Sequence, residues 1–99
     1  MRNVRELVMK AKQENLNNDD IAYVVKKLEA CKSTPDDDLY HYIYILGRGM
    51  YGKPIPPAYK KLIEHFLHYP QKPYISVLAL EILCHYWGFV NDYADVLKQ

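Results

Sequence analysis

The chain has 99 residues, of which 49% are hydrophobic and 25% are charged, so it fits one globular domain with a buried core. Its 13 basic and 12 acidic residues give a formal net charge of +1, which argues against a strongly basic nucleic-acid-binding protein. Ten residues are tyrosine, the one unusual count in the composition.

The start of the chain carries no pattern of a secretory leader, because basic residues interrupt its first apolar segment. No apolar run of about 18 residues occurs, so we expect no membrane span and a cytoplasmic protein. Cys31 and Cys84 stand far apart within apolar patterns. We expect both to be reduced packing residues, with a disulfide as the less favoured alternative.

Two amphipathic helices are predicted in the first third of the chain. Apolar residues recur there at the i, i+3, i+4, i+7 spacing of one helical face. Asn18 or Asp19 is expected to cap the second helix. The first stripe is Val4, Leu7, Val8 and Ala11, and the second is Ile21, Val24, Val25, Leu28 and Cys31.

A third helix is predicted to start near Pro35. Thr34 is expected to accept hydrogen bonds from the free amides of the first turn, and proline suits the first helical position. Three carboxylates follow in the first turn, where the helix dipole favours negative charge. They belong to Asp36, Asp37 and Asp38.

The body of this third helix, residues 39–46, is rich in residues that also favour strands. We predict a helix because its apolar residues follow a 3.6-residue period. They are Leu39, Tyr42, Ile43, Leu46 and Met50.

Three helical segments are predicted in the remainder. Prolines in residues 53–57 break the chain, and a stripe from Tyr59 to Leu67 follows. Residues 74–87 are apolar on almost every side, which predicts a buried central helix that ends at Gly88. Tyr93, Val96 and Leu97 suggest a short final helix.

The second and third parts of the chain resemble each other at an offset of 36 residues, the separation of Gly52 and Gly88. Periods of about 35–45 residues built from helix pairs indicate a helical-repeat stack. At this offset Leu39 maps onto Ile75, Tyr42 onto Leu78, and Leu46 onto Ile82.

Gly47, Gly49 and Gly52 match the G-x-G-x-x-G pattern of dinucleotide-binding loops. Prolines follow where the nucleotide-binding helix would have to continue. We therefore interpret the glycines as a helix end that allows close packing, and we expect no cofactor.

The histidines do not form a metal-binding motif. His65 and His68 are spaced i, i+3, and two ligands are too few for a zinc site, so we expect a solvated face and no metal. Glu81 and His85 are spaced i, i+4 on an otherwise apolar helix. We interpret them as a structural or partner-binding pair, because no nucleophile accompanies them at a recognisable spacing for catalysis.

Tyr40, Tyr44 and Tyr51 lie beside the core stripe of the third helix, whereas Tyr42, Tyr59, Tyr86 and Tyr93 belong to core stripes. Exposed tyrosines are common where proteins dock, although contact with a neighbouring repeat would also place them there. The three aspartates at the head of the helix form an acidic spot that a basic partner can use. The candidate partner-binding residues are Asp36, Asp37, Asp38, Tyr40, Tyr44, Tyr51, Glu81 and His85.

Residues 74–88 resemble the first helix of a HEAT-type repeat, through the pair Ala79 and Leu80 and the closing Gly88. The resemblance implies an all-α fold of about six short helices, packed as three antiparallel pairs in a right-handed stack. Residues 1–99 would form one domain with pairs at about 3–32, 35–69 and 73–99.

A small stand-alone array of this kind resembles the helical immunity proteins of bacterial contact-dependent growth inhibition systems. The resemblance implies a non-enzymatic cytoplasmic protein whose partner is the C-terminal domain of a cognate toxin. A nuclease is the expected toxin, with an RNase favoured. The immunity protein would block its active site or substrate groove. The sequence carries no signal for an oligomeric state.

Two other classes stay open. A nucleic-acid-binding or adaptor module would use basic residues near the start of the chain, but residues 1–32 carry seven basic and five acidic groups, an excess of only two. An enzyme built on Glu81 and His85 ranks third. The basic residues concerned are Arg2, Arg5, Lys10, Lys12, Lys26 and Lys27.

Overall fold

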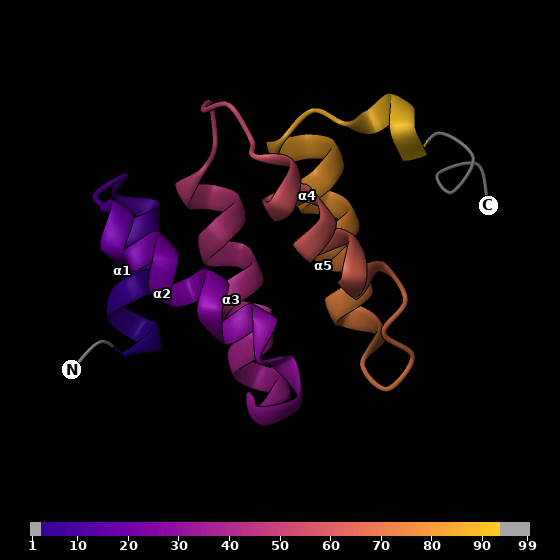
Figure 1. The fold of residues 1–99 in the computed structure, drawn as a ribbon, viewed down its shortest axis with the longest axis horizontal. Helices are drawn as coiled ribbons and strands as arrows, with labels where there is room; N and C mark the ends of the chain where they lie inside the picture. The colour runs from indigo at the N-terminus through magenta and orange to yellow at the C-terminus, as the bar shows by residue number, and fades with distance from the viewer. Residues whose placement is uncertain (1–2, 94–99) are drawn as a thin grey trace.

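The computed structural model describes residues 3–93, and α-helices carry most of them (Figure 1). The short segment η3 is a π-helical turn, and the other three short segments are 3₁₀ turns. No strand occurs in residues 3–93. The elements are α1 (Val4–Lys12), α2 (Asn18–Glu29), η1 (Cys31–Ser33), α3 (Asp36–Gly49), α4 (Pro57–Glu64), η2 (His65–Leu67), α5 (Pro73–Glu81), η3 (Ile82–Tyr86) and η4 (Val90–Tyr93).

Asparagine side chains start the first two helices. The side chain of Asn3 accepts a hydrogen bond from the Glu6 amide at 2.8 Å. Asn17 accepts one from the Asp20 amide, and the Asp20 carboxylate accepts one from the Asn17 amide, so the two residues form a capping box. The cap of α2 is therefore Asn17, which has the extended backbone that a cap requires. The expectation that Asn18 or Asp19 caps this helix is wrong by one or two positions.

The helix predicted over residues 39–46 is confirmed as the body of α3, and the strand alternative is excluded. The expected role of Thr34 is wrong. Its Oγ1 lies 3.0 Å from the carbonyl oxygens of Lys27 and Ala30, so it closes the end of α2 instead of capping α3. Pro35 occupies the N-cap position of α3, one position before the expected one.

Two layers of helices pass along the long axis of the molecule from α1 at one end to η4 at the other (Figure 1). Contacts join α1 to α3 and α3 to α5 in one layer, and α2 to α4 in the other. Further contacts between α2 and α3 and between α4 and α5 connect the layers. The radius of gyration of 12.8 Å matches the roughly 12–13 Å expected of a compact chain of this length.

The core residues of α3 and α5 reproduce the 36-residue offset of the sequence. Gly52 and Gly88, which follow the two helices, both have positive φ angles, 77° and 79°. Their lack of a Cβ makes this left-handed backbone accessible at a helix end. The paired core positions are all buried: Leu39 with Ile75, Tyr42 with Leu78, and Leu46 with Ile82.

The glycines of the G-x-G-x-x-G pattern serve packing. Gly47 and Gly49 lie in the last turn of α3, and no helix follows Gly52 directly. A Cβ on Gly47 would lie 2.1 Å from Cδ1 of the buried Ile82, so glycine allows α3 and η3 to approach closely. The indole nitrogen of Trp87 donates a hydrogen bond to the Gly47 carbonyl oxygen at 3.1 Å in the same contact.

The prediction that residues 74–87 form a helix buried on nearly every side is wrong for one face. Tyr74 is 42% exposed and Val77 is 66% exposed. Tyr74 borders α3 through its ring contact with Tyr40, and Val77 is open to solvent one turn further along α5. Tyr93 is buried in η4, while Val96 and Leu97 of the expected final helix lie outside the described residues.

Within residues 3–93, none of the helices combines the length and the apolar character needed to cross a bilayer.

Candidate functional site

Five tyrosines form a row on the surface of α3 and α5, here called the α3–α5 face. They are Tyr40, Tyr44 and Tyr51 from α3 and the turn after it, and Tyr74 and Tyr86 from α5 and η3. The rings of Tyr40 and Tyr74 lie 5.4 Å apart, and those of Tyr51 and Tyr86 lie 5.9 Å apart, both edge to face. The first pair joins the N-terminal ends of α3 and α5, and the second pair joins their C-terminal ends. The two helices therefore run parallel.

Part of this row is exposed to solvent. Tyr40 is 36% and Tyr51 is 53% exposed, while Tyr44 is half-buried. The guanidinium of Arg48 lies 5.8 Å from the centre of the Tyr51 ring. Burial raises the pKa of Tyr86, and the nearby Tyr44 and Glu81 add to this effect. The structure therefore brings the three candidate tyrosines together on one side of the molecule.

Glu81 and His85 extend the α3–α5 face along α5 and η3. Both are exposed and line a surface hollow of about 530 Å³ together with Val77, Leu80 and Cys84. The sequence offered no nucleophile for this pair, and the structure places the Cys84 thiol beside it. Burial raises the pKa of that thiol, so it stays protonated and is a poor nucleophile at neutral pH. The hollow suits contact with a partner better than covalent chemistry.

The three aspartates do not form one acidic spot. The Asp36 carboxylate accepts a hydrogen bond from the Tyr69 hydroxyl at 2.8 Å, on the side of the molecule where α4 ends. Asp38 lines a groove between α1 and α3. Asp37, between Asp36 and Asp38 in the sequence, is exposed. Successive residues on a helix point about 100° apart, which explains the divergence. The predicted acidic spot is therefore divided among different surfaces.

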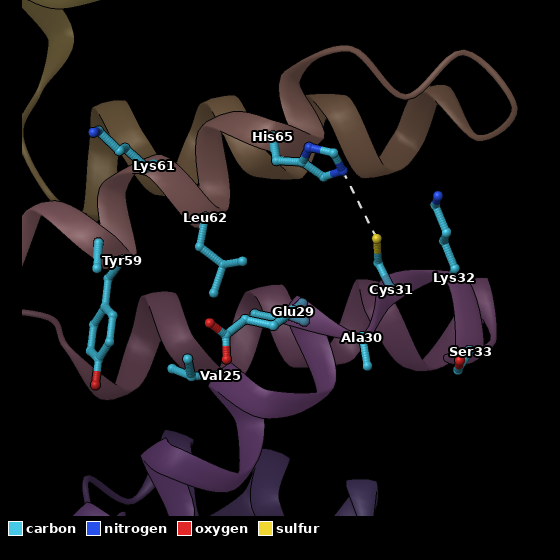
Figure 2. Close-up of a pocket in the computed structure, with 12 residues that line it drawn as sticks. Val25, Glu29, Ala30, Cys31, Lys32, Ser33, Tyr59, Lys61, Leu62 and His65 are labelled. Atoms are coloured by element: carbon cyan, nitrogen blue, oxygen red, sulfur yellow. Dashed lines mark hydrogen bonds between the residues drawn. The ribbon is translucent and has the colours of Figure 1, made fainter.

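A second hollow, here called the α2–α4 groove, lies between α2 and α4 in the other layer (Figure 2). Its volume is about 900 Å³, at the upper end of the range of small-molecule sites. Both apolar and charged side chains line it. They are Val25, Leu28, Glu29, Ala30, Cys31, Lys32, Ser33, Ala58, Tyr59, Lys61, Leu62 and His65.

Cys31 and His65 face each other at one end of the α2–α4 groove (Figure 2). The Sγ atom of Cys31 lies 3.9 Å from Nε2 of His65. Cys31 is half-buried and packs against the edge of the core, in partial agreement with its place in the predicted apolar stripe, and His65 is exposed. Helical periodicity predicts contacts within one element only. It therefore could not show that Cys31 meets His65, which lies 34 positions away in the sequence.

Some of the basic residues expected of a nucleic-acid-binding module already have partners inside the protein. The ammonium group of Lys10 lies 3.4 Å from the buried Asp20 carboxylate. Lys27 lies 5.5 Å from the centre of the Tyr23 ring. Arg2 lies outside the described residues. The ion pair of Lys10 with Asp20 reduces the positive charge that the first two helices offer to phosphates, while the ring contact of Lys27 leaves its charge in place.

The fold and these two surfaces define a small all-α protein with an aromatic face in one layer and a groove in the other. No protein-family model matches the chain, and no curated protein or solved structure matches it. What the protein does is therefore inferred from its own side chains.

Proposed function

We propose that the protein is an immunity protein that binds the C-terminal domain of a cognate toxin and blocks its active site or substrate groove. A nuclease is the proposed toxin, with an RNase favoured. The α3–α5 face is the proposed docking surface. The protein would act by binding and would carry out no reaction of its own.

One observation supports this proposal above the others: the row of tyrosines crosses two helices that are separate in sequence. Tyrosine supplies a large apolar ring with a polar tip and loses little conformational entropy on binding, so it dominates many protein interfaces. Val77 extends the row with an apolar side chain that is 66% exposed. A continuous surface of this kind is characteristic of a protein-binding site.

The arrangement of the helices supports a rigid docking surface. We propose that the helices form three antiparallel pairs in a HEAT-like right-handed stack. The parallel course of α3 and α5, the matching glycines Gly52 and Gly88, and the contact of α3 with η3 at Gly47 are consistent with it. Stacked helices hold side chains in place before binding, which lowers the entropy lost on association.

Charge contributes less to the proposed interaction than the sequence suggests. Because the three aspartates diverge, they do not present adjacent carboxylates that would mimic a phosphate backbone. The α3–α5 face itself carries Arg48, Glu81 and His85, a mixture of both signs. Aromatic and apolar contacts would therefore supply most of the affinity.

Coexpression tests the proposal directly. Cells that produce the toxin encoded by the gene immediately upstream should survive when they also produce this protein. Val77→Asp should abolish protection and weaken binding of the purified toxin domain at least about tenfold, because it places a charge in the contact. Val90→Asp is the matched control, since Val90 is 45% exposed but lies on η4, beyond the end of η3.

Two results would contradict the proposal. If cells die equally fast with and without the wild-type protein, the immunity function is wrong. If both valine variants protect as well as the wild type, the docking surface lies elsewhere. Circular dichroism on both variants verifies that the fold is retained, which is expected because both side chains are on the surface.

A further inference from the structure

The α2–α4 groove brings together a thiol and an imidazole that the proposed function does not use. We propose that Cys31 is a thiol-modification site, at which a low-molecular-weight disulfide that carries a carboxylate forms a mixed disulfide with the protein. Cys31 would be the attacking group and His65 the group that takes its proton. The site lies in the layer of α2 and α4, so it is separate from the α3–α5 face.

The geometry places the two groups in reach of each other and of solvent. The side chain of Cys31 rises from η1 across the end of the groove, and the ring of His65 reaches toward it from the end of α4 (Figure 2). Their separation of 3.9 Å is within the range of a long hydrogen bond to sulfur, and such contacts often tighten when a reactant binds. The exposed imidazole can exchange its proton with water.

The exchange balances without any further reactant. The Cys31 S–H proton passes to Nε2 of His65, and the resulting thiolate attacks one sulfur of the small disulfide. A new S–S bond forms at Cys31 while the original S–S bond breaks. The departing thiolate takes a proton and leaves as a thiol. The protein thiol is oxidised and one half of the small disulfide is reduced, so the disulfide is itself the oxidant.

The groove offers both room and charge for such a molecule. Its volume of about 900 Å³ accommodates a molecule of tripeptide size, and Val25 and Leu62 supply apolar contacts. The Lys32 side chain extends alongside Cys31 toward the level of His65 (Figure 2). Its ammonium group can pair with a carboxylate on a disulfide that is held at the thiol.

Cys84 provides an internal comparison in the same chain. Its thiol is buried, and burial raises its pKa, so little thiolate is present at neutral pH. The two cysteines therefore differ in exposure and in the effect of burial on the thiol, which both control the rate of thiol exchange. Mass spectrometry of peptides from one sample reports on both.

The test is to incubate the protein with glutathione disulfide and to follow each cysteine by mass spectrometry. Cys31 should gain the mixed disulfide while Cys84 stays free. His65→Gln should slow the reaction at least about tenfold, because the thiol then has no neighbouring base. His68→Gln is the matched control, because His68 is also exposed but does not line the α2–α4 groove.

A second comparison tests recognition of the carboxylate. Lys32→Glu should slow exchange with glutathione disulfide about two- to fivefold, as expected for one surface charge. It should slow exchange with the neutral 2-hydroxyethyl disulfide less, because there the charge acts only on the attacking thiolate and not on a bound carboxylate.

Several results would overturn the proposal. They are equal modification of Cys84, an unchanged rate in His65→Gln, equal effects of Lys32→Glu on both disulfides, a disulfide-linked dimer in place of the mixed disulfide, and no reaction at Cys31. None of these outcomes depends on protection against a toxin, so this site and the proposed function are tested separately.

Discussion

The hydroxyl group of Thr34 joins the end of α2 to the start of α3. Helix ends leave carbonyl groups without partners, and α2 ends beside a short 3₁₀ turn. Thr34 Oγ1 lies 3.0 Å from the carbonyl oxygens of Lys27 and Ala30, and only 9% of the residue is exposed. A hydroxyl group donates in this position, whereas the sequence suggested that it accepts from the following helix.

Removal of this hydroxyl group should destabilise the protein without changing its shape. Thr34→Val keeps the branched side chain but removes the donor to the Lys27 carbonyl, while the Ala30 carbonyl keeps its bond from the Ser33 amide. We expect this to cost about 1–2 kcal/mol of unfolding free energy. Thr34→Ser retains the donor and should cost about half as much or less. Urea denaturation of the three proteins measures the difference. Equal stabilities of the valine and serine variants would show that the hydrogen bonds contribute nothing.

At the scale of the helices, Gly47 controls how closely α3 approaches η3. The position where its Cβ would lie is 2.1 Å from Cδ1 of Ile82, which is fully buried and cannot swing into solvent. The hydrogen bond from Trp87 to the Gly47 carbonyl oxygen lies in the same contact. The glycine is therefore needed for packing, although alanine favours an isolated helix.

A double-mutant cycle tests this contact. Gly47→Ala should destabilise the protein by about 1–3 kcal/mol through overpacking. Ile82→Val, which removes Cδ1, should cost about 0.5–1.5 kcal/mol alone. In the double variant the closest contact of the new methyl group is removed with Cδ1, and only the contacts at 2.8 and 2.9 Å with Cγ2 and Cγ1 remain. The combined cost should therefore fall short of the sum by at least about 0.5 kcal/mol. Strictly additive costs, measured by urea denaturation, would contradict this packing role.

The helices were predictable from the sequence because their signals are local. Apolar spacing located α1 to α4, and it separated the buried Tyr42 from the surface-facing Tyr40. The exposed face of α5 was not predictable, because Val77 looks like a core residue until the positions of its neighbours are known. The same limit applies to Cys31 and His65, which meet only when α2 and α4 pack together.

The candidate site was predictable only where its residues belong to one helix. Helical spacing correctly placed Tyr40 and Tyr44 beside the core stripe of α3. It did not show that Tyr74 of another helix would complete the row. The prediction of one acidic spot at residues 36–38 was wrong, because neighbours in sequence point in different directions on a helix.

At the scale of the whole molecule, tyrosine hydroxyl groups join elements that are distant in sequence. Tyr69 donates to Asp36 at 2.8 Å, and Tyr93 donates to Glu64 at 2.6 Å. The second bond holds η4 against α4, together with the ion pair of Lys60 and Asp92 at 2.7 Å. The high tyrosine content thus serves the core and its connections as well as the surface.

Several of these phenols resist ionisation. Burial raises the pKa of Tyr42 to about 12 from an ordinary 10.0, and its contact with Tyr23 adds to the effect. The hydrogen bond to Asp36 raises the pKa of Tyr69. Burial, followed by the bond to Glu64, raises the pKa of Tyr93. The folded protein therefore holds protons that the unfolded chain releases above about pH 10.

Stability should accordingly fall at alkaline pH. Groups with a raised pKa in the folded state contribute their full stabilisation below about pH 10 and lose it as the pH rises toward 12. Tyr42 alone should account for about 1–3 kcal/mol over this range. Urea denaturation at successive pH values measures the slope, which should be shallower for Tyr42→Phe than for the wild type. Thr34→Ser, which alters a non-titrating hydroxyl group, should keep the wild-type slope. An unchanged slope in Tyr42→Phe would show that the proton on Tyr42 contributes nothing to folding.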